Sequence, residues 1–339
     1  MGKHVVVIGA GPAGLETSAS LANLGFTVTL VEKEASTGGH LKKWHALFPA
    51  MISGPNALET IRKGLNETIK IQASTKITSL EAVNDYFTVT GHNGWQVKAD
   101  AIVLATGFQL FDARRKEEYG YGIYENVITS ADLEELFASG NPLLNRQGIK
   151  PERIGFVDCV GSRDEKVNNL HCSKVCCVTA VKQAIEVKQL LPDAEVFCFY
   201  MDLRMFGRHY EELYKEAQEK YNIQFIRGRL SESTEDQDGN IVVKVEDTLM
   251  GKPLRIKTGL LVLMVGMEPA AKTKNLLRQL GLKEVPDGFI QPVDEVLLSN
   301  CTEIPGVFVA GACSGPKSIA DTLADARSAA LAVAGFLKK

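Results

Sequence analysis

The sequence predicts an α/β fold made of two dinucleotide-binding (Rossmann-like) domains, each completed by a β-hairpin or β-meander layer. Three observations predict this fold. A glycine-rich turn follows an apolar strand near the N-terminus, a second glycine turn precedes a long alanine-rich helix near the C-terminus, and two similar apolar strands ending in glycine lie between them. The 339 residues of the chain are enough for two domains with substantial cores.

The first strand, Val5–Ile8, is short, apolar and rich in β-branched residues, as is typical of a buried parallel strand. Gly9, Gly11 and Gly14 follow it in the pattern G-x-G-x-x-G, which permits a tight turn, close approach to a pyrophosphate and close helix packing. Glu32 ends the next strand, where an acid can bond a ribose hydroxyl. A glycine-rich turn without a ligand is the alternative. The cofactor-binding residues expected here are Gly9, Gly11, Pro12, Ala13, Gly14, Glu32 and Lys33.

This motif does not distinguish FAD from NAD(P), but two other features favour FAD. A second glycine turn, residues 37–40, follows Glu32 closely. Near the C-terminus, the strand 307–310 leads through a glycine turn into a helix starting near Ser318, whose N-terminus can stabilise a reduced flavin. Lys317 either assists there or is a solvated loop lysine. The further flavin-site residues expected are Gly39, His40, Leu41, Ala105, Thr106, Gly107, Gly311, Ala312, Lys317, Ser318 and Ile319.

An internal repeat predicts the domain organisation. The segments ADAIVLATGFQ (99–109) and TGLLVLMVGMEP (258–269) are alike, and each follows a polar, strand-rich stretch. We therefore expect an FAD-binding domain made of residues 1–113 and 259–339, with a second domain of similar fold, residues 114–258, inserted into it.

The second domain lacks the phosphate-binding glycines. When IGFVDCVGSR is aligned with VVVIGAGPAG, Asp158 takes the place of Gly9 and Val160 that of Gly11. The loop to the next helix is also several residues longer. Because little remains to receive a pyrophosphate closely, NAD(P)H binding in this domain is not expected.

Four cysteines stand where that loop would be. Cys159 ends the strand, and we place Cys172, Cys176 and Cys177 where the helix CCVTAVKQAIEVKQLL begins, with Cys172 one turn before Cys176 if the helix starts early enough. Helix N–H groups and the helix dipole favour anionic sulfur. Four thiolates can hold a four-iron cluster or a zinc ion. The spacing alone leaves an iron–sulfur cluster, a zinc site and a redox dithiol open.

Composition narrows the class of protein. The net charge is −3 without a basic block, which argues against nucleic-acid binding. We find no apolar run long enough to span a membrane and no signal peptide, so we expect a cytoplasmic protein without membrane insertion. Seven cysteines, an odd number, favour metal or redox use of the cluster over structural disulfides.

The remaining candidates have simpler interpretations. Cys198 is predicted to be a core residue, Cys301 a loop thiol, and Cys313 a packing residue in the flavin turn. Arg163 and Arg204 either stabilise the charge of the cysteine site or form ordinary ion pairs. No catalytic residue is assigned.

Four segments, CVGSRD, CSKVCC-x₄-KQA, MDLRMFGRHYEELY and AGACSGPKSIADT, resemble the A subunit of heterodisulfide reductase. The resemblance implies two domains arranged as in thioredoxin and glutathione reductases, with FAD and a [4Fe–4S] cluster as cofactors. It implies that the cluster is bound by Cys159, Cys172, Cys176 and Cys177. It also implies a homodimer, iron–sulfur B- and C-like partner subunits, and a possible sulfur- or lipoyl-carrier partner.

The chain departs from the methanogen A subunits. It has no cysteine in WHALFPAMISGPNALE and no additional cluster motifs, so it is most similar to the short A-like subunit of the heterodisulfide reductase-like complex of sulfur oxidisers. The missing clusters count against flavin-based electron bifurcation, and the sequence leaves open whether it occurs. The expected function is an oxidoreductase subunit that relays electrons between FAD and the cluster in sulfur-compound oxidation. The alternatives are the A subunit of a quinone-interacting membrane-bound oxidoreductase, a thioredoxin reductase-like dithiol flavoenzyme, and a non-catalytic scaffold.

Ala312 replaces the aspartate that thioredoxin reductase-like flavoproteins carry after the equivalent of Gly311.

Overall fold

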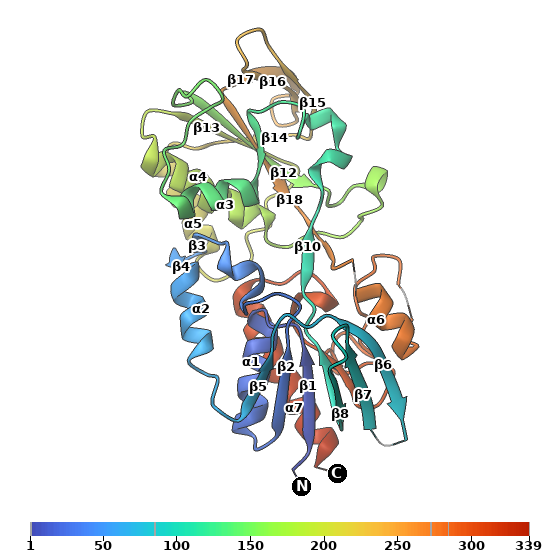
Figure 1. Cartoon of the computed structure of the whole chain (residues 1–339). Coiled ribbons are helices and arrows are strands. Elements are labelled where there is room, and N and C mark those ends of the chain that lie inside the picture. Colours follow the sequence, from blue (N-terminus) through green and yellow to red (C-terminus); the bar gives the residue numbers. More distant parts are fainter. Residues whose placement is uncertain (1, 85, 272, 284, 339) are drawn as a thin grey trace. The chain divides into compact units, whose positions relative to one another are not determined.

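A computed structural model describes residues 2–84, 86–271, 273–283 and 285–338 (Figure 1). The chain divides into two compact units. Unit 1 comprises residues 1–42, 55–109 and 268–339, and unit 2 comprises residues 43–54 and 110–267. The predicted boundaries differ from this division in the segments 43–54, 110–113 and 259–267, which we expected in the first domain and which belong to unit 2.

Unit 1 is built on a five-stranded parallel sheet in the order β20-β9-β1-β2-β5. Its strands are β1 (His4–Ile8), β2 (Thr27–Val31), β5 (Ile69–Gln72), β9 (Ala101–Leu104) and β20 (Val307–Val309). Helices α1 (Pro12–Asn23) and α7 (Ile319–Leu337) pack against each other beside the sheet. Its other helices are α2 (Gly54–Arg62) and α6 (Thr273–Leu280).

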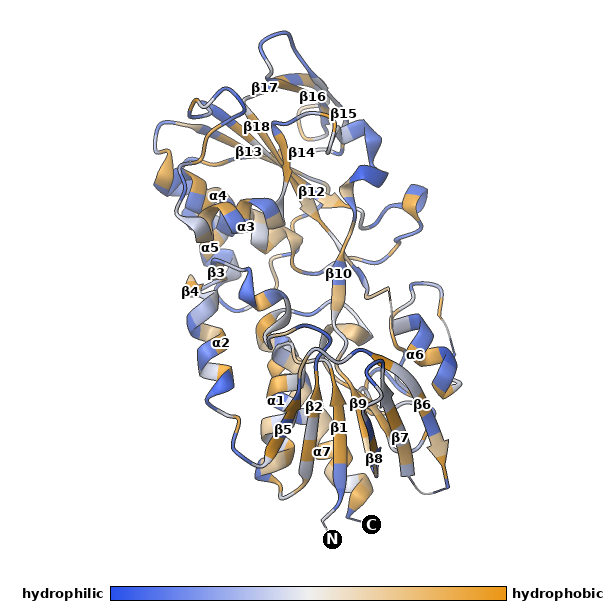
Figure 2. Ribbon diagram, viewed as in Figure 1, coloured by the Kyte–Doolittle hydropathy of each residue, from blue (hydrophilic) through white to orange (hydrophobic). Residues whose placement is uncertain are grey.

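The opposite face of this sheet is covered by an antiparallel meander and α6. The meander consists of β6 (Ile77–Val83), β7 (Tyr86–Gly91) and β8 (Gln96–Ala99). Val6 and Ile8 share one face of β1 because side chains alternate along a strand, and both pack in a cluster with Phe87 and Leu276. Figure 2 shows the hydrophobic character of the central strands that this packing requires.

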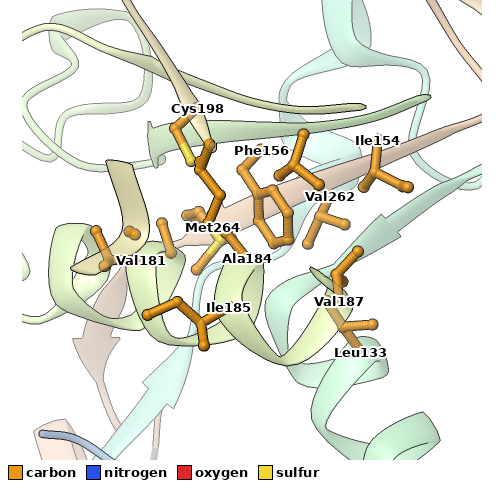
Figure 3. Packing of buried hydrophobic residues seen from close by; sticks show 14 of the residues in the cluster. Leu133, Ile154, Phe156, Val181, Ala184, Ile185, Val187, Cys198, Val262 and Met264 are labelled. Carbon is orange, nitrogen blue, oxygen red and sulfur yellow. The ribbon is translucent and has the colours of Figure 1, made fainter. Parts of the chain in front are cut away.

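Unit 2 repeats this plan with a parallel sheet in the order β11-β18-β12-β13-β14. Its strands are β11 (Val127–Thr129), β12 (Arg153–Val160), β13 (Glu195–Tyr200), β14 (Gln224–Arg227) and β18 (Leu260–Val265). One face packs against α3 (Ser130–Ser139), α4 (Cys176–Leu190) and α5 (Tyr210–Glu219). Figure 3 shows Phe156, Val262 and Met264 of the sheet packed beside the α4 side chains.

The other face of the second sheet packs against its own meander, formed by β15 (Leu230–Glu235), β16 (Ile241–Asp247) and β17 (Lys252–Thr258). The segment 43–54 adds the short pair β3 (Ala46–Leu47) and β4 (Ile52–Ser53). The chain passes between the units at β10 (Phe108–Leu110) and β19 (Met267–Pro269). The predicted α/β class, with a doubled sheet-and-meander plan, is therefore confirmed.

The two sheets also agree in register. Ile8 of β1 pairs with Leu104, and Val157 of β12 pairs with the corresponding Leu263. Asp158 of β12 therefore lies directly after the regularly paired part of its strand, at the position where Gly9 follows β1. Among the described residues, no helix combines the length and apolar character needed to span a bilayer.

Candidate functional site

The connection between β1 and α1 has the close contacts that its glycines predict. A Cβ atom at Gly9, where φ is +105°, would lie 2.3 Å from the carbonyl oxygen of Ala105. A Cβ atom at Gly14 would lie 1.8 Å from the carbonyl oxygen of Gly9. Helix α1 starts with Pro12 after Gly11, and no side chain caps it. Its first N–H groups are therefore available to an anion.

Three other predicted segments meet this helix start. Gly39 faces Gly11, since a Cβ atom at Gly39 would lie 3.1 Å from the Gly11 Cα atom. Ala105 lies against Gly9, and Gly311 lies so close to Ala13 that a Cβ atom there would come within 2.5 Å of the Ala13 Cβ atom. The structure thus brings together all four segments that the sequence assigned to the flavin.

Glu32 is buried at the end of β2 and holds the loop in place. One carboxylate oxygen accepts a hydrogen bond from the Ala10 N–H at 2.8 Å, and the other accepts one from the Glu34 N–H at 2.9 Å. Lys33, by contrast, is exposed and helps line a hollow with Glu34, Ser74, Lys76 and His92.

The second glycine turn is fixed by backbone and ring contacts. The Gly38 N–H donates to the carbonyl oxygen of Ala10 at 2.7 Å. His40 Nε2 lies 3.0 Å from the carbonyl oxygen of Phe108, and the two rings stack with centroids 4.5 Å apart. Leu41, the next residue in the sequence, is buried, so His40 and Leu41 are both held by the protein itself.

The turn after β9 contributes two further predicted residues. The hydroxyl of Thr106 lies 2.9 Å from that of Thr273 at the start of α6. Gly107 has φ of +68°, and no described atom lies near the position that a side chain would take. This open space is compatible with a bound cofactor.

The C-terminal glycine turn depends on a residue that the sequence analysis missed. One carboxylate oxygen of Asp325 on α7 accepts a hydrogen bond from the Gly311 N–H at 2.6 Å, and the other accepts one from the Asn300 side chain at 3.0 Å. Asp325 follows Asp321 by four residues in an alanine-rich helix, so both carboxylates lie on the same face of that helix. This spacing was the available signal that Asp325 could also lie near the glycine turn.

Lys317 and Ser318 also have defined partners. Lys317 Nζ donates to the Gly311 carbonyl oxygen at 3.2 Å and to Ser314 Oγ at 2.8 Å, so Lys317 is not simply a solvated loop lysine. Ser318 caps α7 in a reciprocal pair with Asp321, which places Ile319 as the first helical residue. Cys313 is buried, and burial raises its pKa to about 11. Packing therefore explains Cys313.

In unit 2, three of the four cysteines gather beneath the start of α4. Cys159 lies in an irregular stretch of β12 with φ of +60°, an uncommon conformation for a residue other than glycine. Cys176 and Cys177 are the first two residues of α4. All three are buried and belong to the same apolar cluster.

Mutual hydrogen bonds polarise these thiols. The hydrogen bond with Cys176 lowers the pKa of Cys159 below its ordinary value, and a hydrogen bond with Cys176 also lowers the pKa of Cys177 to about 7. The pKa of Cys176 is raised by its hydrogen bonds with Cys159 and Cys177 and by burial. Hydrogen bonding to Cys176 thus lowers the pKa of two thiols, one in β12 and one at the start of α4.

Charged and polar groups surround this set. Burial raises the pKa of Asp158 well above its ordinary value, and the neighbouring Cys177 contributes to the rise. Arg163 interacts with Cys159 and forms an ion pair of 2.7 Å with Asp202. The backbone N–H of Arg204 lies next to Cys177 and lowers the pKa of its thiol. Arg163 therefore forms the ordinary ion pair that was one of its two predicted roles and also interacts with a thiol, and Arg204 contacts the site through its backbone.

Cys172 lies outside this group. It was expected near the first turn of the helix, but α4 begins at Cys176 and Cys172 lies in the preceding loop. Its Sγ atom accepts a hydrogen bond from the Lys174 N–H at 3.3 Å, and Cys172 is only partly buried. The regular hydrogen bonds of α4 begin with the one from the Thr179 N–H to the Val175 carbonyl oxygen. The loop, not the helix, therefore fixes the position of Cys172.

The donor chemistry fits a sulfur-ligated group, because three buried thiols lie together and two of them favour the thiolate. Within the described ranges, however, no group of three or more His, Cys, Asp or Glu side chains converges as ligands of a single metal ion. Cys198 in β13 is buried, and burial raises its pKa well above its ordinary value, so its predicted core role is confirmed.

Comparisons with known proteins agree with the fold described above. The family model described as pyridine nucleotide-disulphide oxidoreductase matches residues 3–151 and 176–331. The unmatched interior segment, 152–175, contains β12 and the cysteine loop. The part of the chain that the family model does not match therefore includes Cys159 and Cys172.

Similar proteins include A subunits of heterodisulfide reductases from two archaea whose names follow. The A subunit of the H₂/formate:CoB-CoM heterodisulfide,ferredoxin reductase from Methanococcus maripaludis is 44% identical over 244 residues, which cover 70% of this chain and 37% of that protein. An iron–sulfur A subunit of the CoB–CoM heterodisulfide reductase from Methanopyrus kandleri is 32% identical over 421 aligned residues, covering 98% of this chain and 64% of that protein. The chain thus spans less than two thirds of the length of these relatives.

Solved structures share the fold. Thioredoxin reductase from Lactococcus lactis superposes with a TM-score of 0.68 at 20% identity, covering 99% of both chains. Thioredoxin reductase from T. acidophilum superposes with a TM-score of 0.67 at 19% identity, covering 99% of this chain and 98% of that one. Because the family model matches most of the chain, the chain belongs to the pyridine nucleotide-disulphide oxidoreductase family, a family of oxidoreductases, and its relatives include heterodisulfide reductase A subunits.

Proposed function

We propose that the protein is an electron-transferring flavoprotein subunit of a heterodisulfide reductase-like complex. In this proposal unit 1 binds FAD, unit 2 binds a [4Fe–4S] cluster, and electrons pass between the two cofactors. The observation that carries the proposal is the replacement in unit 2. Four strands, β18-β12-β13-β14, have the same order as β9-β1-β2-β5 of unit 1, but the connection from β12 to α4 presents cysteines where the connection from β1 to α1 presents glycines.

FAD binding is supported by the four segments that meet at the start of α1. The N–H groups after Gly11 would receive the pyrophosphate, and Glu32 would position the loop while accepting from a ribose hydroxyl. The N–H groups at the start of α7, after Ser318, would face the pyrimidine end of the flavin. When bound, the flavin would supply two-electron chemistry and the cluster one-electron chemistry.

The cluster ligands in this proposal are Cys159, Cys172, Cys176 and Cys177. Iron–sulfur clusters are held by cysteine thiolates, and the hydrogen bonds around Cys159 and Cys177 favour that state. Arg163 would balance part of the negative charge, because it already lies between Cys159 and Asp202. Unit 2 would then have no role in binding NAD(P)H.

The proposed partners, location and role are inferred from the names of the relatives. We propose iron–sulfur partner subunits of the B and C type, a homodimer within the complex, a cytoplasmic location and a role in sulfur-compound oxidation, with a sulfur- or lipoyl-carrier protein as a further partner. The support is that relatives are named as A subunits of heterodisulfide reductases, and that this chain has no cysteine in the segment 44–59. A quinone-interacting membrane-bound oxidoreductase would use the same cofactors with another acceptor.

Anaerobic spectroscopy of the purified chain tests the proposal. We expect flavin absorption, about four irons and four acid-labile sulfides per chain, and an EPR signal of a reduced [4Fe–4S] cluster after dithionite. Stoichiometric zinc without iron would contradict the cluster, and flavin that dithionite does not reduce would contradict the electron-transfer role.

A thioredoxin reductase-like dithiol enzyme is the second candidate. Hydrogen bonds between thiols favour it, because Cys176 lies within hydrogen-bonding reach of both Cys159 and Cys177. Such an enzyme would lose two titratable thiols on mild oxidation and would reduce a disulfide with NADPH. Robust NADPH-dependent disulfide reduction by the iron-free chain would favour this candidate, and no turnover would favour the cluster.

A further inference from the structure

A buried group of charged side chains attaches the segment 43–54 to two helices of unit 2. The segment belongs to unit 2, although the chain on both sides of it belongs to unit 1. The His45 N–H donates to Glu134 Oε2 on α3 at 2.8 Å, and His45 Nδ1 lies 2.8 Å from Glu186 Oε1 on α4. Lys182 on α4 contacts both of these carboxylates. The backbone and the ring of His45 are therefore each held by a carboxylate.

The charges of this group do not balance while the imidazole of His45 is neutral. The side chains of Glu134, Glu186 and Lys182 are at most 5% exposed. Two carboxylates and a single ammonium group leave one negative charge without a partner, and an unpaired buried charge is strongly unfavourable. One additional proton, on His45 or on Glu186, removes that charge. Burial and the neighbouring Glu134 raise the pKa of Glu186 above its ordinary value, which agrees with this shortage of positive charge.

A second ion pair near His45 is already complete. Lys43, two residues earlier in the segment, lies 3.0 Å from Glu135 on α3, and both side chains are more than half exposed. The pair of His45 and Glu186 differs, because it joins a ring that is 45% exposed to a carboxylate that is only 5% exposed. The ring can therefore exchange a proton with solvent, and the buried carboxylate provides the charge that retains this proton.

We infer that His45 and Glu186 form a proton-binding pair that holds the segment 43–54 to α3 and α4 more strongly when it is protonated. Imidazole ordinarily binds a proton near pH 6.5, so we expect the pair to take up one proton from solvent between about pH 8 and pH 5. A proton that the attached state binds more tightly favours that state at low pH, and this contribution is lost as the pH rises.

The segment is a tie within the chain. Both of its ends continue into unit 1, so its attachment to α3 and α4 adds to the connections at β10 and β19. The proton therefore controls how firmly unit 2 holds a stretch of chain that starts and ends in unit 1. This inference does not depend on the flavin or the cluster of the proposed function.

Hydrogen exchange of the full chain tests the inference. Exchange in peptides that cover residues 43–54 would be followed by mass spectrometry at about pH 6 and about pH 8, on either side of the ordinary imidazole titration. The rates would be corrected for the intrinsic pH dependence of amide exchange. The wild type would be compared with His45→Gln, Glu186→Gln and the control His209→Gln. His209 is a matched control, because its Nδ1 lies 3.6 Å from Glu212 and both side chains are more than half exposed.

In the wild type we expect protection of the segment to fall about threefold to tenfold from the lower to the higher pH, because one pKa unit corresponds to a factor of about ten. Glu186→Gln leaves Glu134 and Lys182 as a balanced pair, so this variant should be well protected at both pH values. His45→Gln keeps the unbalanced charge, so it should be weakly protected at both. His209→Gln should match the wild type.

The opposite results expected for the two site variants separate proton binding from the loss of a hydrogen bond, which would weaken protection in both. Peptides from β16 and β17 should exchange equally in all four proteins and would verify that each is folded.

Three results would overturn the inference. Equal protection of the wild-type segment at both pH values would show that no proton holds it. If Glu186→Gln is as weakly protected as His45→Gln, the carboxylate is only a structural partner of the ring. If His209→Gln loses the pH dependence, the proton is bound at another site. Because the measurement needs no cofactor, none of these results depends on the proposed function.

Discussion

The β1–α1 connection of unit 1 and the β12–α4 connection of unit 2 occupy the same position in two sheets whose strands β9-β1-β2-β5 and β18-β12-β13-β14 correspond in order. In unit 1 the helix starts at Pro12, almost directly after the strand, and small residues line its start. In unit 2 residues 161–175 separate the strand from the helix, and thiols occupy the first helical turn. The comparison teaches that the sheet fixes where a ligand can bind, whereas the connection decides its chemistry.

The physical difference lies in the space at the helix start. In unit 1, Gly9 and Gly14 allow the loop backbone to lie against itself, so the helix N–H groups stay accessible. In unit 2, Asp158 lies in the irregular end of β12, and Cys176 and Cys177 are themselves the first residues of α4. A helix N-terminus stabilises either a phosphate or a thiolate, which explains how one fold can serve both.

The largest effect is expected for Gly14→Ala in unit 1. The added methyl group would lie 1.8 Å from the Gly9 carbonyl oxygen, so strand and helix must separate. We expect the free energy of unfolding to fall by about 3 kcal/mol or more, with loss of bound flavin. Denaturant unfolding and flavin absorption measure both effects.

Gly335→Ala in α7 is the matched control, because no described atom lies within 4 Å of the added Cβ position. It should raise stability by about 0.5–1 kcal/mol, as expected for alanine in a helix interior. Equal behaviour of the two variants would contradict the close packing of the β1–α1 connection.

The next effect concerns how unit 2 holds the segment 43–54. Lys182 on α4 is fully buried, contacts Glu134 and Glu186, and donates to the Ala46 carbonyl oxygen at 3.0 Å. Lys182→Met would leave the two carboxyl groups without this cation. We expect a loss of about 3–5 kcal/mol in the free energy of unfolding, measured by urea titration.

Lys215→Met on α5 provides the control for that change. Lys215 is exposed and forms a long ion pair of 3.7 Å with Glu219 one turn later. Its substitution should change stability by less than about 0.5 kcal/mol. If Lys182→Met were equally mild, the segment 43–54 would not depend on the buried cation.

A smaller effect is expected for Asp325→Asn, which weakens the support of the C-terminal glycine turn. The carboxylate accepts from the Gly311 N–H, and an amide oxygen can replace it only as a neutral acceptor. We expect a loss of about 1–3 kcal/mol in the free energy of unfolding and weaker flavin binding, measured by unfolding and by flavin titration.

Arg327→Gln on the same helix is the control. It removes the ion pair between the exposed Arg327 and Glu16 and should cost less than about 1 kcal/mol. The account of this turn fails if Arg327→Gln weakens flavin binding more than Asp325→Asn does.

The smallest effect concerns the unit 2 meander. Hydrogen bonding to Lys257 lowers the pKa of Asp236 from 3.8 to about 2. A depressed pKa in the folded state gives stability that is present above pH 3.8 and is lost as the pH falls toward about 2. Asp236→Asn should therefore flatten the pH dependence of unfolding in that window only. The effect should be small and should decrease with salt because the pair is exposed; a change confined to neutral pH would contradict it.

Most of the fold could be predicted because the signals are local. The apolar strands, the glycine turns and the repeat of 99–109 in 258–269 predicted both sheets and both meanders. The packing of the segment 43–54 with unit 2 could not be predicted, because it depends on the burial of Lys182, and a lysine in a helix ordinarily indicates an exposed face.

The site was predicted less completely. The glycine segments came together as expected because each glycine reports a close backbone approach. Cys172 was expected too close to the start of α4, because the hydroxyl of Ser173 accepts a hydrogen bond from the distant Met267 N–H and does not cap the helix, which begins one residue after Val175. Asp325 was missed because it lies fourteen residues after Gly311 in sequence and is brought back by the helix.

Locating iron in a crystal of the anaerobically purified chain tests the central claim most directly. Anomalous scattering measured on both sides of the iron absorption edge would show whether iron is present and where. We predict one compact iron peak in unit 2, enclosed by the Sγ atoms of Cys159, Cys172, Cys176 and Cys177. Iron-free density at these thiols, with a nicotinamide nucleotide bound at the start of α4, would contradict the account.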